Sequence, residues 1–165
     1  MKIKPFGHVF LAATILLLVA CDESSLCLSG QNAIQAGLYS GASGEAKDTT
    51  LNGVYLWGYD EINDVNLPLL IDSARVQKMY MPTNIERDTT SFVFREQTIA
   101  SDIVDTIMFV YTRELNYVSG DCGFTYNLHI DTVIHTINII DSIVVDYPSV
   151  LYNENLENVK IFIEP

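Results

Sequence analysis

The sequence is poor in cysteine, in basic residues and in long apolar runs. Its 165 residues contain 3 cysteines, 1 tryptophan and 9 Lys and Arg side chains, against 21 Asp and Glu. The resulting net charge of −12 disfavours nucleic acid as a partner, because phosphate binding depends on Lys and Arg. The chain has no CxxC motif and no GxSxG motif, so neither a cysteine metal site nor a hydrolase nucleophile elbow is indicated.

The longest apolar run, Val9 to Val19, follows Lys2 and Lys4. Its length of about eleven residues is too short to cross a bilayer, which takes about 20. A basic start, a short apolar run and then small residues before Cys21 are typical of a secretory signal. We therefore expect a signal-peptide helix over residues 1–20. A short membrane anchor or a buried N-terminal helix is the alternative.

Cys21 would be the first residue left after cleavage. A thiol in that place resembles a lipoprotein acceptor, which takes diacylglycerol on sulfur and a further acyl chain, such as palmitate, on nitrogen. The prediction is a lipid-anchored tether over residues 21–30 and one domain over 31–165. Asp22 and Glu23 resemble the surface-export signal of Bacteroidetes-type lipoproteins, and this resemblance implies the outer membrane, on its periplasmic or its surface side. Retention at the inner membrane is the alternative.

The two remaining cysteines, Cys27 and Cys122, would meet an oxidising compartment after export. An even remainder predicts one disulfide between them. It would close a long loop and could add up to about 4 to 5 kcal/mol of stability. Two free thiols serving redox chemistry or metal binding are the alternative.

Alternation of apolar residues predicts strands through the whole domain. The expected strands include 34–39, 54–59, 91–95, 107–118, 124–134, 143–145 and 159–163. The apolar phase slips after Ile134, which predicts a turn or bulge near 131–136. Residues 40–52 and 60–68 are expected to be exposed loops. Seven to nine strands indicate an all-β, antiparallel immunoglobulin-like β-sandwich, with a small calycin-like β-barrel as the alternative.

Three short stretches carry a resemblance to a known family. They run from Tyr111 to Leu115, from Tyr117 to Ser119 and from Cys122 to Phe124. The chain there resembles small uncharacterised lipoproteins of Bacteroidetes-type bacteria, with Cys27 matching an early cysteine of that family. The segment from Asn138 to Ile143 is also similar. The resemblance covers roughly residues 21–165. It implies a location in the cell envelope and a fold, but it implies no catalytic residues.

Candidate sites for chemistry are few. His129, Asp131 and His135 share strand parity and could hold a metal. A solvent-facing polar row, broken by the expected turn, is the favoured interpretation. The acidic stretch 60–64 could be a weak calcium loop, but it lacks the glycine and the terminal glutamate of an EF-hand, so a solvated turn is favoured. We expect no metal, no cofactor and no catalytic residue.

Tyr55, Trp57 and Tyr59 fall on one side of a predicted strand. They could stack on a sugar or another ligand, although core packing gives the same pattern and is the favoured interpretation. Asp followed by Ser or Thr and a small or apolar residue recurs six times, similar to an O-glycosylation sequon of exported Bacteroidetes-type proteins. Strand starts after turns would also produce it. The acceptors would be Thr49, Ser73, Thr89, Thr106, Thr132 and Ser142.

These observations favour a lipid-anchored module of the cell envelope with a binding or structural role and no enzyme activity. Its partners would be the membrane, through the N-terminal lipid, and an envelope protein or a glycan. A small-ligand or glycan-binding lipoprotein is the alternative, and a deep pocket with convergent polar groups would favour it. A hydrolase would require buried, clustered ionisable groups in a cleft.

Overall fold

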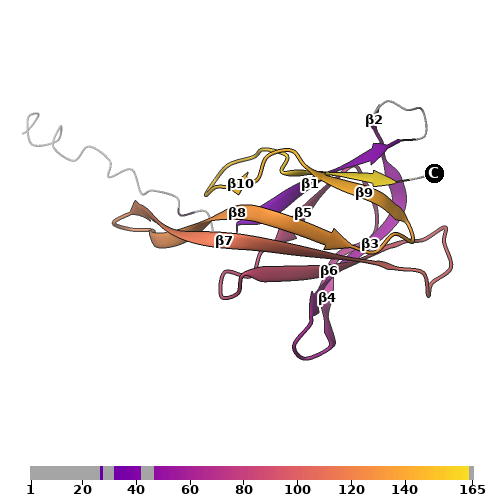
Figure 1. Cartoon of the computed structure of the whole chain (residues 1–165), viewed down its shortest axis with the longest axis horizontal. Coiled ribbons are helices and arrows are strands. Elements are labelled where there is room, and N and C mark those ends of the chain that lie inside the picture. The colour runs from indigo at the N-terminus through magenta and orange to yellow at the C-terminus, as the bar shows by residue number, and fades with distance from the viewer. Residues whose placement is uncertain (1–26, 28–31, 42–46, 164–165) are drawn as a thin grey trace, which may run out of the picture.

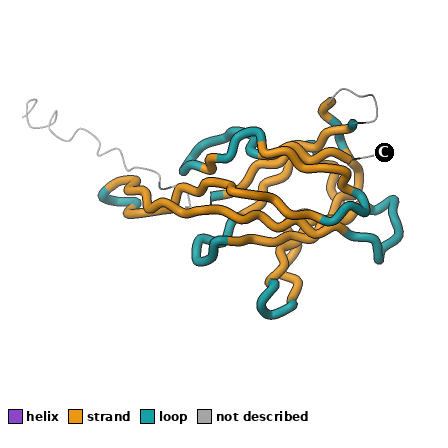
Figure 2. Tube along the Cα trace, viewed as in Figure 1, coloured by secondary structure: helices purple, strands orange, loops and turns teal. Residues whose placement is uncertain are grey.

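The computed structural model of the protein describes Cys27, residues 32–41 and residues 47–163 (Figure 1). The predicted signal-peptide helix over 1–20 and the predicted lipid acceptor Cys21 lie outside these residues. Every regular element in the described part is a β-strand, as Figure 2 shows. In that part, no helix has the length and apolar character needed to cross a membrane.

The strands differ widely in length. In chain order they are β1 (Ala33–Ser40), β2 (Lys47–Asp48), β3 (Leu51–Asp60), β4 (Val65–Val76), β5 (Lys78–Pro82), β6 (Thr89–Glu96), β7 (Asp105–Ser119), β8 (Gly123–His135), β9 (Ile140–Val145), β10 (Ser149–Val150) and β11 (Val159–Ile163).

The strands form two sheets, consistent with the predicted β-sandwich. One sheet has the order β2–β1–β11–β9, with β5 also paired to β1, and the other has the order β10–β8–β7–β6–β3–β4. The pair β1–β11 is parallel and the remaining pairs are antiparallel. The all-β prediction is therefore confirmed at the level of two packed sheets.

The core lies between the inward faces of the two sheets. Along β7, the alternate residues Ile107, Phe109 and Tyr111 are buried, as the period of two predicts. Phe109 meets Phe92 of β6 edge-on, with 6.2 Å between the ring centroids. Burial of each such side chain contributes about 1.5 to 3 kcal/mol, so this cluster accounts for much of the stability of the domain.

Four of the strands, β2, β4, β5 and β10, were not predicted. The loop expected over 60–68 turns only as far as Asp64, because β4 begins at Val65. β4 lies at the edge of its sheet, and its residues from Val65 to Leu70 are all exposed, so its apolar residues show no alternation. β5 was also not expected, and the short β2 lies inside the loop expected over 40–52.

The phase slip predicted near residues 131–136 is a β-bulge. Val110 pairs with Thr132 and Tyr111 pairs with Ile130, which leaves Asp131 as the extra residue on β8. The strand continues through His135 without a turn. Ile134 consequently points outward and is exposed, so the apolar phase changes at Asp131 and not after Ile134 as expected.

Asp105 fixes the segment that leads from β8 into β9. This buried carboxylate accepts hydrogen bonds from the Thr136 hydroxyl and from three backbone N–H groups, at 2.5 to 2.8 Å. The three N–H groups belong to Asn138, Ile139 and Ile140. Burial pushes the pKa of Asp105 up, but these hydrogen bonds outweigh that effect and hold the pKa below its usual value.

The predicted disulfide is present. Cys27 and Cys122 are bonded, with 5.3 Å between their Cα atoms, across a sequence separation of 95 residues. Cys122 lies in the turn between β7 and β8, so the bond fastens the start of the described chain to the tip of that hairpin. Figure 1 shows the hairpin projecting at one end of the molecule.

Candidate functional site

A pocket of about 410 Å³ opens between the β3–β4 hairpin and the segment that links β5 to β6. Its volume falls within the usual range for small-molecule sites, about 300 to 1,000 Å³. The apolar part of its lining consists of Tyr59, Ile62, Leu67, Pro68, Leu70, Pro82 and Phe92. The polar part consists of Asp60, Glu61, Thr83, Asn84, Arg87, Thr89, Thr90 and Ser91.

The walls of the pocket come from three separate segments. Gly58 and Phe92 are paired neighbours on β3 and β6 and form its inner end. A Cβ atom on Gly58 would lie 3.1 Å from the Leu67 side chain, so glycine allows β4 to approach β3 closely there. The edge strand β4 therefore covers one side of the pocket, while Arg87 and its neighbours form the other.

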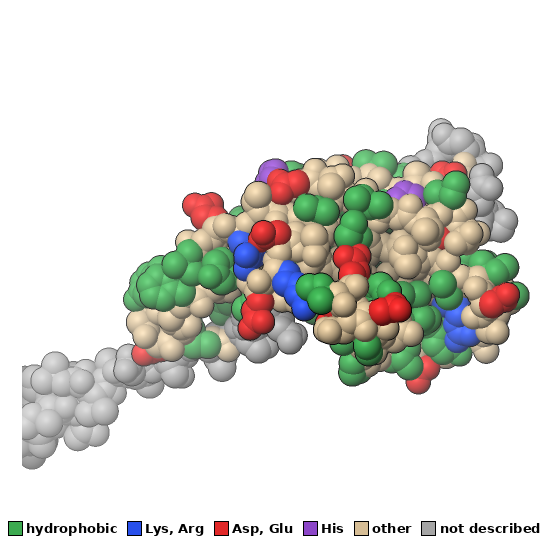
Figure 3. Space-filling view, turned by 60° about the horizontal axis from the view of Figure 1, so that its bottom comes forward, with side chains coloured by type: hydrophobic (Ala, Val, Ile, Leu, Met, Phe, Trp, Pro, Cys, Tyr) green, Lys and Arg blue, Asp and Glu red, His purple; other side chains and the backbone are tan. Residues whose placement is uncertain are grey.

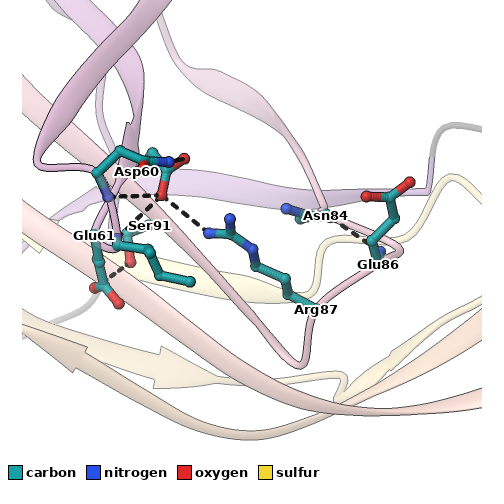
Figure 4. Close-up of polar contacts among 8 residues, drawn as sticks. Asp60, Glu61, Asn84, Glu86, Arg87 and Ser91 are labelled. Atoms are coloured by element: carbon teal, nitrogen blue, oxygen red, sulfur yellow. Dashed lines mark hydrogen bonds and ion pairs between the residues drawn. The ribbon is translucent and has the colours of Figure 1, made fainter.

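Asp60 and Arg87 face each other across the pocket (Figure 4). The Arg87 Nη1 donates to Asp60 Oδ1 at 3.0 Å. Asp60 also accepts bonds from the Asn63 side chain at 2.8 Å and from the backbone N–H groups of Ile62 and Asn63. The Asn63 and Arg87 contacts lower the pKa of Asp60 to about 2. Asp60 is therefore a fixed anion at neutral pH and cannot supply a proton.

Glu61 and Ser91 form a second polar contact at the same mouth. The Ser91 hydroxyl donates to Glu61 Oε1 at 2.6 Å, and Figure 4 shows both side chains beside Asp60. With Arg87 as the one cation among these groups, the three charged side chains carry a net negative charge. The pocket therefore disfavours an anionic ligand.

The Arg87 segment is held in place by several hydrogen bonds, most of them partly buried. The Tyr111 hydroxyl donates to the Asn84 carbonyl oxygen at 2.8 Å and lies 2.6 Å from Thr90 Oγ1. The Asn84 N–H donates to Thr90 Oγ1, and its side-chain oxygen accepts from the Glu86 N–H. Burial raises the pKa of Tyr111, so the phenol stays protonated at neutral pH.

Arg113 of β7 forms an ion pair with the segment that links β5 to β6. Its Nε lies 2.7 Å from Asp88 Oδ1, and its Nη1 donates to the Ile85 carbonyl oxygen at 2.6 Å. β7 therefore contacts the segment that links β5 to β6 at a second point, in addition to the Tyr111 hydrogen bonds.

The three predicted stacking residues lie on the outer face of β3. The neighbouring Val54 and Leu56 are fully buried, whereas Tyr55, Trp57 and Tyr59 are half-buried, so the favoured interpretation as core residues is wrong. Both alternating sets of residues on this strand are apolar, and the set with the smaller side chains points inward.

Each of the three aromatic side chains has a polar or charged neighbour. The Arg95 guanidinium lies 4.0 Å from the Tyr55 ring centroid, the Trp57 indole N–H donates to Asn66, and the Tyr59 hydroxyl donates to Asp64. Of the three, only Tyr59 lines the pocket.

The histidine pair does not converge. The bulge at Asp131 turns His129 and His135 to opposite faces of β8, where His129 is exposed and His135 half-buried. Among the described residues, no group of three His, Cys, Asp or Glu side chains is placed to hold a metal ion. The acidic stretch 60–64 is a turn whose carboxylates already bind Arg87 and Tyr59.

The six predicted glycan acceptors lie in different environments. Ser73, Thr106 and Thr132 are exposed, whereas Thr49, Thr89 and Ser142 are half-buried. Thr89 lines the pocket, and the Ser142 hydroxyl donates to the neighbouring Asp141.

The pocket itself was not predicted. Its residues come from three chain segments and carry no short motif, so the only available signal was the acidic stretch beginning at Asp60.

The chain belongs to DUF6452, a family of unknown function, whose model matches residues 53–163. All the residues lining the pocket lie inside that range, whereas Cys27 lies outside it. Neither a curated protein nor a solved structure matches the chain.

Proposed function

We propose that the protein is a non-catalytic binding module of the cell envelope, held at the outer membrane by lipid on Cys21. The order of basic, apolar and small residues before Cys21 supports this address. The Cys27–Cys122 disulfide supports it independently, because such bonds persist in exported proteins and are rare in the cytosol.

The 410 Å³ pocket is the observation that carries the binding role. It combines an apolar lining with a few converging polar groups, as small-molecule sites do. Asp60 is paired with Arg87, Glu61 accepts a hydrogen bond from Ser91, and the three charged groups carry a net negative charge. We propose an uncharged or cationic ligand with an apolar body, whose polar end would bond to Asn84, Arg87 or Glu61.

Filling the pocket tests this proposal. Leu70 lines the pocket, while its neighbour Leu69 pairs with Trp57 and does not line it. We expect Leu70→Trp to weaken binding at least about tenfold, because the indole occupies the ligand volume. Leu69→Trp, the matched control, should bind like wild type. The measurement is an NMR titration with a panel of neutral, cationic and anionic fragments, in which the Gly58 amide and Arg87 side-chain signals report on the pocket.

A panel that moves neither reporter in the wild-type protein would contradict the proposed site. So would a fragment that binds the pocket of wild type and Leu70→Trp equally well. Selection of anionic fragments would overturn the proposed ligand class while leaving the site in place.

Glycan binding is the second candidate, and the outward placement of Trp57 supports it. Aromatic faces stack on sugar rings, and Asn66 Oδ1, 2.8 Å from the Trp57 indole nitrogen, is a polar group beside the ring. In the same titration, oligosaccharides that shift the Trp57 indole signal without shifting Gly58 would favour this candidate.

Several finer assignments stay proposals. We propose that the chain is a lipoprotein of the Bacteroidetes type and carries a glycan on at least one of its six acceptors, which exposure favours at Ser73, Thr106 and Thr132. For the topology, the parallel pairing of β1 with β11 supports an immunoglobulin-like arrangement. The consecutive order β6–β7–β8 supports the barrel-like alternative.

A further inference from the structure

The outer part of the β7–β8 hairpin extends beyond both sheets. β6 pairs with β7 only from Asp105 to Val110, and β10 pairs with β8 only at Leu128 and His129. In the described part of the chain, residues 114–127 therefore form a two-stranded ribbon with no third strand beside it. Such a ribbon is only marginally stable in water, and here the Cys27–Cys122 bond fastens its tip.

The ribbon carries the inward, apolar face of its sheet out into solvent. Leu115 pairs with Tyr126, and Tyr117 pairs with Phe124, on the same face as the buried Leu128. Leu115, Tyr117 and Phe124 are 58%, 59% and 65% exposed. The Tyr117 and Phe124 rings lie edge to face, with 5.2 Å between their centroids. We call these three side chains the apolar tip; Figure 3 shows green side chains gathered at that end.

The apolar tip lies next to the point where the chain would leave the membrane. Cys122 is two residues from Phe124 and is bonded to Cys27, which is six residues after Cys21. Six extended residues span at most about 20 Å. The disulfide adds 5.3 Å between the Cα atoms and the two residues to Phe124 add about 7 Å, so lipid on Cys21 would hold the apolar tip within about 30 Å of the anchor, which is about the thickness of the hydrocarbon core.

We propose that the apolar tip lies in the lipid interface and forms a second membrane contact beside the Cys21 anchor. This inference rests on the proposed lipid anchorage. Tyr117 suits the interfacial region, where its aromatic ring meets lipid and its hydroxyl meets water, and Leu115 and Phe124 supply apolar area to bury there. A tether that already holds the protein at the surface removes most of the cost of association, so three side chains are enough.

The charge of the chain selects the type of lipid. Glu114 and Asp121 lie beside the apolar tip, and the whole chain carries −12. An anionic surface would repel the domain, so the tip contacts uncharged lipid headgroups through apolar burial. The membrane contact would orient the domain as well as anchor it, with the hairpin end of the molecule toward the bilayer.

Depth-dependent fluorescence quenching tests the inference. The full chain is expressed in a host that processes lipoproteins, with Trp57→Phe as background and Tyr117→Trp as reporter. It is reconstituted into vesicles of brominated phosphatidylcholine. The control reporter is Ile137→Trp in the same background, because Ile137 is 76% exposed and lies in the loop after β8, outside the apolar tip. We expect at least about threefold stronger quenching at position 117 than at 137.

The outcomes separate the two proposals. Flotation of the protein with the vesicles, together with equal quenching at 117 and 137, would overturn the membrane contact and leave the anchorage standing. Loss of flotation would contradict the anchorage itself. Phe124→Trp is a second reporter, in case the Tyr117→Trp variant misfolds. Its fluorescence should be quenched as strongly as that of Tyr117→Trp. If sedimentation shows a dimer and neither reporter is quenched by the lipid, the apolar tip would instead contact a second copy of the chain. That result would overturn the inference.

Discussion

Replacing Cys27 and Cys122 together with serine is expected to lower the free energy of unfolding by about 4 kcal/mol. The reason is the length of the closed loop. The bond joins residues 95 positions apart, and its loss frees that loop in the unfolded chain. The folded state also suffers, because the β7–β8 ribbon loses the fastening of its tip. Urea unfolding followed by circular dichroism measures the change.

Reduction of the wild-type protein is the control for the serine exchange. Treatment with a thiol reductant should shift the unfolding midpoint as far as the double substitution does. The reductant should leave the double variant itself unchanged. An unfolding free energy within about 1 kcal/mol of wild type for both would show that the bond contributes little to the fold.

Substitution of Asp105 is expected to be comparably severe. Asp105→Ala leaves the buried backbone N–H groups of Ile139 and Ile140 without their acceptor and also removes the acceptor of the Asn138 N–H. Each buried donor left without a partner costs about 1 to 3 kcal/mol, so the two buried N–H groups together cost about 2 to 6 kcal/mol. Asp102→Ala is the matched control, because Asp102 is exposed and lies three residues earlier. Urea unfolding at pH 7 compares the two variants.

Asp105 also predicts how stability depends on pH. Its pKa in the folded protein lies below the usual 3.8, so folding favours the ionised form. Its contribution is therefore fully present above pH 4 and is lost as the pH falls through the lowered folded pKa. The Asp105→Asn variant should lose stability less steeply than wild type below pH 4, while Asp102→Asn should follow wild type. Parallel curves for all three proteins would contradict the assignment.

The sequence predicts the central strands well because one face of each strand is buried and the other is more exposed. Ile107, Phe109 and Tyr111 alternate with more exposed neighbours, and only a strand with one buried face satisfies that pattern. The edge strand β4 lacks this signal, because it buries neither face between Val65 and Leu70. Alternation also cannot say which face is inward, so Trp57 was assigned to the core when Leu56 occupies it.

The candidate site was beyond prediction for a different reason. Asp60, Asn84 and Arg87 meet because the β3–β4 hairpin packs against the segment that links β5 to β6, and no short motif encodes such an encounter. The structural role of Asp105 could not be predicted either, because an aspartate before a strand is common in turns. The cysteines could be paired because only two remained once Cys21 was assigned to lipid.

The central claim is that Cys21 becomes the acylated first residue of an exported protein. Metabolic labelling with an alkyne fatty acid, followed by mass spectrometry of the purified chain, tests it most directly. We expect the label on an N-terminal Cys21 peptide, residues 1–20 missing, and no label on a Cys21→Ala variant. An unlabelled protein that still begins at Met1 would contradict the account.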